Sequence, residues 1–553
     1  MPTRIIDSHC HIFNVDDLPV YRFLRHVALP ERCLEHLDAL AWLLAKFLKA
    51  LAPGAEAERR VLLASSARGA IPAEAPVDDP QRREDALANA LGMLRNHARG
   101  DLRPRSRAAS LTEEDPLPPR DQAAALLQLL RQDAAPSGLR SRSVPQRART
   151  LPADPELRAI ARDLVGSNAQ QPRMPGPRAS VSLSNLAMLF RWAGQLAGYR
   201  HRLASTLGNI SGAPTRPVLL TPALIDFGRW IHTDREFSTG PAAVFAVQVE
   251  MMALIAAGRP GGALVHPFVP YDPWHAAVEL AAGRANPPLA LVRDAIGHRG
   301  AVGVKLYPPM GFRAWRNAEV AADEYPVELR EETGGRPGYW LDRALGELYE
   351  ECARLDAPIM AHCADSNEGR PRAGLFADPT WWEAAVQEFR ELRVNLGHFG
   401  GVWLLDGDDK RCDGREKANW TLLAADIVAR HPRQVWADMS YFAEVLSDGK
   451  PREDAVKALR HLAANSAAPN LLYGSDWIMM GQEQGASDYA SQTMSAAAEA
   501  GLPLENFAWR SAARFLGLDR EGQSRDRLLA FHARDPAALT AIRGFMPGLS
   551  PAA

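Results

Sequence analysis

Short apolar runs alternate with longer amphipathic stretches from about residue 216 onward. Each run is rich in Val, Leu or Ile and is bounded by Gly, Pro or Asp, which is typical of a strand buried on both faces. The stretches between the runs, such as LDRALGELYEECARL, have helical spacing, so the alternation predicts a parallel sheet. Seven runs share this pattern: PVLLTPALID (217–226), GALVHPFV (262–269), AVGVKLYPP (301–309), APIMAHCA (357–364), LRVNLGHF (392–399), QVWADMSY (434–441) and NLLYGSDW (470–477).

An eighth run, RIIDSHCHIF, lies at residues 4–13. Eight parallel strands that alternate with helices predict an α/β fold of the (β/α)8 TIM-barrel type. The rival architecture is an open doubly wound sheet, which usually has a Gly-rich phosphate loop after its first strand. Because the first strand here ends in His-Cys-His instead, the pattern favours the barrel.

A large insertion separates the first two predicted strands. It has helical patterns at 34–52, 82–95 and 183–207, whereas residues 135–180 are rich in Pro, Arg and Ser and lack periodic apolar positions. Such a composition predicts a mobile, disordered segment, so we expect an insertion that is partly helical and partly disordered. The predicted organisation is strand 1 in residues 1–16, the insertion in 17–215, the rest of the barrel in 216–518 and a C-terminal extension in 519–553.

Composition and charge narrow the class of protein. Hydrophobic residues make up 46% and charged residues 24%, and the formal net charge is −2. We therefore expect no nucleic-acid or membrane partner, a small-molecule substrate, and a homo-oligomer as an open alternative to a monomer. The five cysteines are scattered without a Cys-x-x-Cys pair, and no signal-peptide core precedes residue 5. These features predict a cytoplasmic protein.

Histidines and one aspartate fall where the predicted strands end. His9 and His11 are two apart on the first strand and so point to the same side. His362, His398 and Asp476 each end a later strand. Since the C-terminal ends of barrel strands meet around one opening, these side chains are expected to converge there. Imidazole and carboxylate ligands suit a divalent metal, and zinc best of all.

The motifs DSHCHIF, AHCAD, GHFGG and YGSDW, together with the closing stretch ENFAWRSAARFLGL, resemble the amidohydrolase superfamily. More specifically, they are similar to its amidohydrolase-related branch, which includes hydrolases and some non-oxidative decarboxylases. The resemblance covers residues 4–14 and roughly 216–518, and it does not cover the insertion.

The resemblance implies a role for each ligand. His9, His11, His362 and Asp476 would hold a divalent metal, and Asp476 would also take a proton from the metal-activated water. VGVKLYPP resembles the strand of dihydroorotase-like members, in which a lysine becomes a carbamate that bridges two metals. Two interpretations therefore stay open. In the first, the site holds one metal, and His398 is a catalytic residue that hydrogen-bonds the substrate or the water. In the second, the site holds two metals, and carbamylated Lys305 and His398 are further ligands.

Weaker candidates follow the fourth strand. Tyr307 and Arg313 are predicted to bind a substrate carboxylate, although a surface salt bridge is as good an interpretation of Arg313. His266 either lines the pocket or is structural, and Asp438 either supports a ligand or caps a helix.

The ligands alone do not decide the reaction. The first hypothesis is a metal-dependent hydrolase of an amide, ester, lactone or related bond. The second is a metal-dependent decarboxylase on the same metal site, and a non-enzymatic scaffold is the third.

Overall fold

The computed structural model describes residues 2, 4–25, 29, 36–66, 80–100, 117–133, 155–166, 183–212, 214–224, 242–364, 373–401 and 420–546. The described residues form two compact units. The first, called the barrel unit, lies within Met1–Phe13, Gly54–Ile71 and Tyr199–Ala553; the second, called the helical unit, lies within Asn14–Pro53 and Pro72–Gly198. These limits differ from the predicted insertion at 17–215, because the described parts of 54–71 and 199–215 pack in the barrel unit.

The barrel unit contains two parallel sheets with strand orders β1-β2-β3 and β4-β5-β6-β7-β8-β9. A parallel bridge between Ala223 and Phe268 connects the two sheets. This alternation of parallel strands and helices is the α/β TIM-barrel fold that the sequence predicts. The strands are β1 (Ile6–Cys10), β2 (Leu219–Pro222), β3 (Leu264–Val265), β4 (Phe268–Pro270), β5 (Gly303–Leu306), β6 (Ile359–His362), β7 (Val394–Gly397), β8 (Val435–Met439) and β9 (Leu471–Tyr473).

One predicted strand is divided in two. The run at 262–269 forms β3 and β4, with His266 and Pro267 between them. Proline has no N–H to donate to a neighbouring strand, so the ladder is interrupted at Pro267. The remaining seven runs each contain one observed strand that lies inside the predicted limits.

The end of β9 lies beside β1. The Asp476 N–H donates to the His9 carbonyl at 2.8 Å, and the Ser8 hydroxyl donates to the Tyr473 carbonyl at 2.5 Å. These bonds hold β9 and the residues after it against β1, which contains His9 and leads into His11.

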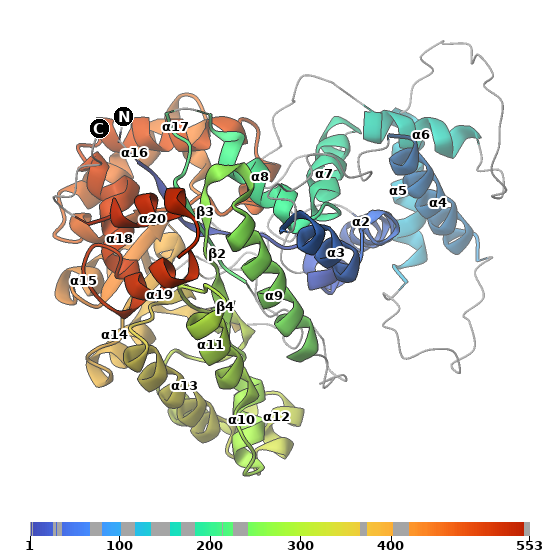
Figure 1. The fold of residues 1–553 in the computed structure, drawn as a ribbon. Coiled ribbons are helices and arrows are strands. Elements are labelled where there is room, and N and C mark those ends of the chain that lie inside the picture. Colours follow the sequence, from blue (N-terminus) through green and yellow to red (C-terminus); the bar gives the residue numbers. More distant parts are fainter. Residues whose placement is uncertain are drawn as a thin grey trace. The chain divides into compact units, whose positions relative to one another are not determined.

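Helices lie outside the strands of the barrel unit (Figure 1). Many of them bury one apolar face; on α13, for example, Leu341, Leu345, Leu348 and Cys352 recur at helical spacing and are buried. The helices are α3 (Ala55–Ser66), α8 (Arg200–Ile210), α9 (Ala242–Gly258), α10 (Pro273–Ala281), α11 (Pro287–His298), α12 (Val327–Glu332), α13 (Pro337–Arg354), α14 (Pro379–Glu388), α15 (Trp420–Arg430), α16 (Lys450–Ala463), α17 (Tyr489–Glu499), α18 (Ser511–Leu516), α19 (Gln523–Phe531) and α20 (Pro536–Arg543).

Several of these helices begin with the same two-residue signal. An Asp or Asn caps the helix by accepting backbone N–H groups, and the next residue is a proline whose missing N–H costs nothing at the first helical position. The pairs are Asp272-Pro273, Asn286-Pro287, Asp378-Pro379 and Asp535-Pro536. These two residues therefore fix the position at which each helix begins.

The helical unit consists of helices that bury apolar faces against one another. They are α1 (Val20–Phe23), α2 (Leu37–Leu51), α4 (Pro80–Ala98), α5 (Arg120–Asp133), α6 (Pro155–Gly166) and α7 (Leu183–Leu196). The helical pattern predicted at 183–207 divides into α7 and α8.

The helix α6 corrects the prediction of a mobile segment at 135–180. Leu157, Ile160, Ala161 and Leu164 are buried and recur at helical spacing, which the prolines and arginines around them obscured. The rest of that predicted segment lies outside the described residues.

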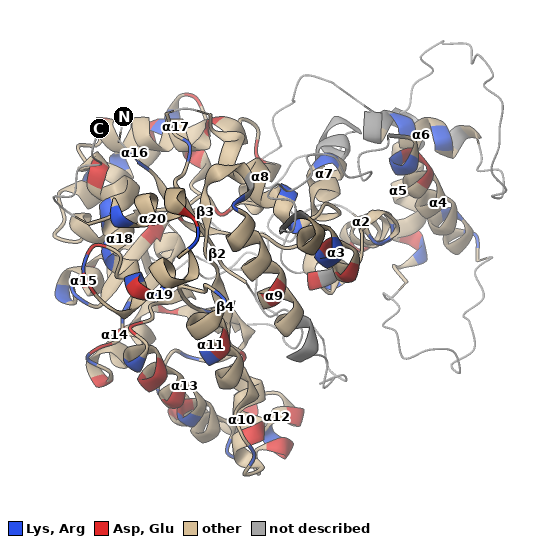
Figure 2. Ribbon diagram, in the orientation of Figure 1, with Lys and Arg blue, Asp and Glu red and all other residues tan. Residues whose placement is uncertain are grey.

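Each helix in the described part of the chain is too short or too polar to cross a lipid bilayer. Lys and Arg are interspersed with Asp and Glu along helices such as α13 (Figure 2). Many of these charges pair locally, as Arg343 does with Glu347 at 3.2 Å.

His266, left open between pocket and structural roles, is structural. Its Nδ1 donates to the Gly300 carbonyl at 2.8 Å, so its Nε2 accepts from Nε2 of His532 at 3.0 Å. Burial, together with the neighbouring His532, lowers the pKa of His266 to about 3, although the bond to Gly300 opposes this. His266 is therefore neutral in the folded protein at neutral pH.

This histidine predicts a pH dependence of stability. The unfolded chain protonates His266 near pH 6.5, but the folded chain does so only near pH 3. The unfolded state thus binds more protons in this window, and stability falls as the pH falls, by about 1.4 kcal/mol per pH unit for such a group. Urea denaturation at pH 7, 5.5 and 4 should show a shallower loss for His266→Gln than for the wild type. Equal slopes for the two proteins would contradict this assignment.

Candidate metal centre

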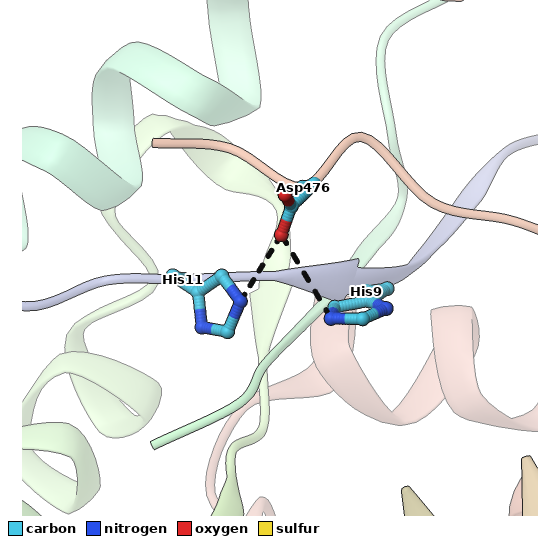
Figure 3. Close-up of side chains that lie close together, drawn as sticks. All are labelled: His9, His11 and Asp476. Atoms are coloured by element: carbon cyan, nitrogen blue, oxygen red, sulfur yellow. Dashed lines mark ion pairs between the residues drawn. The ribbon is translucent and has the colours of Figure 1, made fainter. Parts of the chain in front are cut away.

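Three buried side chains of the barrel unit converge on one point. Nε2 of His11 lies 3.1 Å from Oδ1 of Asp476, and Nε2 of His9 lies 3.8 Å from the same oxygen. Figure 3 shows both imidazoles turned toward that carboxylate oxygen. One ligand atom from each residue lies within 4.8 Å of the others. Zinc bonds of about 2.0–2.1 Å in a tetrahedron place ligand atoms about 3.3 Å apart, so this group fits a divalent ion.

The backbone brings these side chains close at some conformational cost. Asp476 and His398 have φ values of 52° and 62°, a region that non-glycine residues adopt infrequently and that Asp tolerates better than most. Two glycines leave room for the His9 side chain. A Cβ at Gly397 would lie 2.9 Å from Cε1 of His9, and one at Gly474 would lie 2.7 Å from its Cβ.

Asp438 supports the ligand His9 and does not cap a helix. Its Oδ2 lies 2.9 Å from Nδ1 of His9 and accepts from the Asn395 amide at 2.6 Å. Its Oδ1 accepts from the backbone N–H of His398 at 3.1 Å. A carboxylate that accepts from Nδ1 leaves Nε2 of His9 with a free lone pair, which is the form that binds a metal.

The surroundings favour metal-binding protonation states of His9 and Asp476. Burial lowers the pKa of His9 to about 4 even though Asp438 opposes it. Burial works to raise the pKa of Asp476, but the hydrogen bond from His11 and the charges of nearby histidines bring it below its usual value. His9 is therefore neutral and Asp476 ionised at neutral pH.

Lys305 lies in the same buried region. Its Nζ is 3.4 Å from Nε2 of His9. Burial lowers its pKa to about 8, while Asp438 and Asp476 act in the opposite direction. A lysine with this pKa is partly unprotonated near neutral pH, which is the form that reacts with carbon dioxide.

His362 and His398 form the other side of the site. Their ring centroids are 4.7 Å apart, and His398 is also 4.7 Å from His9. Among the described His, Cys, Asp and Glu residues, the one group with ligand spacing contains neither of them. The rings of the four predicted histidines thus lie in one region. The ligand atoms that are close enough to bind one metal ion belong to His9, His11 and Asp476. The ligand role of His362 stays a prediction.

The two predicted substrate-binding residues have different surroundings. The Tyr307 ring lies 4.6 Å from the ring of His362, so it borders the site. The Arg313 guanidinium stacks on the Trp381 ring at 3.8 Å from its centroid. Arg313 is thus held by a cation–π contact, and no salt bridge of it occurs within the described residues.

Sequence reasoning missed Ser440 and Asn395. Ser440 follows the end of β8, two residues beyond Asp438, and its hydroxyl oxygen lies 3.0 Å from Nδ1 of His9. Asn395 lies within β7, and its amide donates to Asp438. A period-two scan from Asp438 would have found Ser440, and one inward from Gly397 at the end of β7 would have found Asn395.

The close contact at Gly397 carries a prediction. A Cβ there would also lie 2.8 Å from the Ala361 carbonyl, so Gly397→Ala must displace His9. We expect zinc affinity to fall by about 10- to 100-fold, the usual effect of disturbing a ligand's orientation. Competition with a chromogenic chelator measures it. Gly297→Ala is the matched control because a Cβ at Gly297 meets nothing within 4 Å; a loss in Gly397→Ala no larger than in that control would refute the displacement of His9.

The fold and the ligand group together define a TIM-barrel protein with a buried site for a divalent metal. The sequence model of the amidohydrolase family matches residues 209–518, which is more than half of the chain. The chain therefore belongs to the amidohydrolase family, as the motifs at the strand ends predict. A search of curated proteins finds no match.

Solved structures show distant likenesses. A Lactobacillus casei ATCC 334 protein named as a metal-dependent hydrolase is 12% identical, with a TM-score of 0.37, and the match covers 93% of this chain and 95% of that one. The 5-carboxyvanillate decarboxylase of Sphingomonas paucimobilis is 13% identical, with a TM-score of 0.35 and coverage of 60% and 90%. The corresponding enzyme of Novosphingobium aromaticivorans DSM 12444, solved with manganese, is 13% identical, with a TM-score of 0.33 and coverage of 60% and 88%.

Proposed function

We propose that the protein is a metal-dependent hydrolase that activates water for attack on an amide, ester, lactone or related bond. The observation that carries this proposal is the convergence of His9, His11 and Asp476, whose ligand atoms lie within 4.8 Å of one another in a buried site. The nitrogen and oxygen donors favour zinc. We favour a single ion because the described His, Cys, Asp and Glu residues form one group whose ligand atoms are close enough to bind the same ion. The two-metal alternative requires carbamylation of Lys305.

The residues of the site have distinct tasks in this proposal. When bound, a divalent ion polarises a substrate carbonyl and lowers the pKa of coordinated water to about 7. Asp476 is ionised and accepts a proton beside the ion. Asp438 holds His9 in place, and His398 donates a hydrogen bond to the substrate. Tyr307, whose ring lies 4.6 Å from that of His362, and Arg313 would bind a carboxylate of the substrate.

A metal-dependent decarboxylase is the second candidate. The observation that favours it is the pair of imidazoles of His362 and His398, 4.7 Å apart, because a decarboxylase must deliver a proton to carbon. In this case the ion would orient a carboxylated substrate rather than activate water.

One experiment separates these functions. The purified chain is stripped with a chelator, reconstituted with zinc or manganese, and incubated with panels of lactones, esters, amides and aromatic carboxylates. Metal-dependent formation of a carboxylic acid from a lactone, ester or amide supports the hydrolase. Release of carbon dioxide from an aromatic carboxylate supports the decarboxylase. A protein that binds no divalent metal would contradict both proposals and favour the non-enzymatic scaffold.

A further inference from the structure

We propose that Ser440 is a positioning residue that fixes the proton of His398 on Nε2, so that His398 is a hydrogen-bond donor in the site and not a metal ligand. The task of His398, which is to donate a hydrogen bond to the substrate, rests on the proposed function. The position of its proton rests on the hydrogen bonds alone.

The Ser440 hydroxyl lies between two imidazoles. Its oxygen is 3.0 Å from Nδ1 of His9 and 3.0 Å from Nδ1 of His398. Ser440 is buried, with 1% of its surface exposed, so bulk solvent does not reach its hydroxyl group. Its direct neighbours therefore decide the direction of each bond.

The carboxylate of Asp438 decides the direction at His9. Besides Nδ1 of His9, the carboxylate accepts from the Asn395 amide and from the backbone N–H groups of His398 and Ser440. Donors on both oxygens stabilise the ionised form, which can only accept. Nδ1 of His9 must therefore carry a hydrogen, and it cannot accept one from Ser440.

The direction at His398 follows from this. Within the described part of the chain, the two imidazole nitrogens are the only partners of the Ser440 hydroxyl group. If both nitrogens donated to its oxygen, the buried O–H would have no acceptor, which is costly. The O–H therefore donates to Nδ1 of His398. The Ser440 carbonyl also lies near this nitrogen, but at 3.5 Å the contact is at the outer limit of a hydrogen bond.

An imidazole that accepts at Nδ1 carries its proton on Nε2 when it is neutral. The two histidines thus differ: His9 has a free lone pair on Nε2, and His398 has an N–H there. This arrangement selects substrates with an acceptor, such as a carbonyl or carboxylate oxygen. It also opposes the two-metal alternative, in which His398 would need a free lone pair.

Nitrogen-15 NMR of the full chain with labelled histidines tests the proton position. His398→Asn identifies the His398 signals in the wild-type spectrum. We expect the wild type to have the Nε2–H form of His398, Ser440→Thr to keep it because it retains a hydroxyl group, and Ser440→Ala to lose it. Ser440→Cys replaces the hydroxyl by a thiol, which is a weak hydrogen-bond donor, and should also lose the Nε2–H form. This second variant provides the test if the alanine variant does not fold. Ser511→Ala, which removes another buried serine that bonds to the Pro469 carbonyl, is the matched control.

Zinc binding separates this role from a merely structural one. Ser440→Ala should change zinc affinity by less than about threefold, whereas Asp438→Asn should weaken it by about 10- to 100-fold, because Asp438 offers the Nδ1–H of His9 a charged acceptor and Ser440 offers it only a neutral one. A wild-type His398 with its proton on Nδ1, or an unchanged His398 in both Ser440→Ala and Ser440→Cys, would overturn the inference. Failure of the wild type to bind zinc would instead refute the proposed function, and the spectra of the metal-free protein would still decide the role of Ser440.

Discussion

Replacement of Glu58 by glutamine is expected to destabilise the barrel unit by about 3–5 kcal/mol, since it removes one charge of a buried ion pair. Glu58, on α3, accepts from the Arg200 guanidinium at 2.7 Å and from the backbone N–H of His201 at 3.0 Å. The side chains of Glu58 and Arg200 are 0% and 1% exposed. Urea denaturation, followed by tryptophan fluorescence, measures the change.

The charge of Glu58 is maintained by its surroundings. Burial works to raise its pKa, but the hydrogen bond from His201 and the charge of Arg200 bring the pKa below the usual value for a glutamate. A glutamine keeps the shape of the side chain and one acceptor oxygen. The expected loss therefore comes from the lost negative charge beside the Arg200 guanidinium and not from a cavity.

The neighbouring pair provides a matched control. Arg59, also on α3, contacts Glu250 on α9 at 2.8 Å, but these side chains are 39% and 34% exposed. Because solvent screens such a pair, Glu250→Gln should leave the denaturation midpoint almost unchanged. Equal effects of Glu58→Gln and Glu250→Gln would show that burial of the ion pair does not govern its contribution.

The strands and the family were predictable because they depend on local pattern. A buried parallel strand needs a short run of Val, Leu and Ile, and all eight predicted runs contain observed strands. The ends of those strands carried His9, His11 and Asp476, and the rule that parallel strand ends share one side brought them together. Predicting that these three side chains converge therefore required no knowledge of side-chain geometry.

The supporting contacts were not predictable in the same way. The role of Ser440 depends on a distance of 3.0 Å to two histidines from other strands, and no sequence spacing encodes that distance. The need for glycine at position 397 arises from the approach of His9 across the barrel. In α6, four buried apolar residues among prolines and arginines were too short a pattern to outweigh the composition around them.

Asp476→Asn is expected to lower kcat by about 10²- to 10⁴-fold on whichever substrate the metal-reconstituted protein accepts, because an amide cannot take up the proton that a carboxylate accepts. Asparagine retains an oxygen ligand for the metal. It also tolerates the φ of 52° at this position, since Asn and Asp are the residues best suited to that region after glycine. The fold and the metal content should therefore be largely preserved while turnover is lost.

The measurements are steady-state kinetics, metal content per chain and thermal denaturation of the same preparation. Asp535→Asn is the matched control: it makes the same chemical change at the cap of α20, where Asp535 accepts from backbone N–H groups of Ala537 and Ala538 and asparagine caps equally well. Wild-type turnover in Asp476→Asn would assign the base to another group of the site. A loss of metal in parallel with the loss of activity would instead mean that Asp476 acts mainly as a ligand, because the charge of the carboxylate would then be needed to hold the ion.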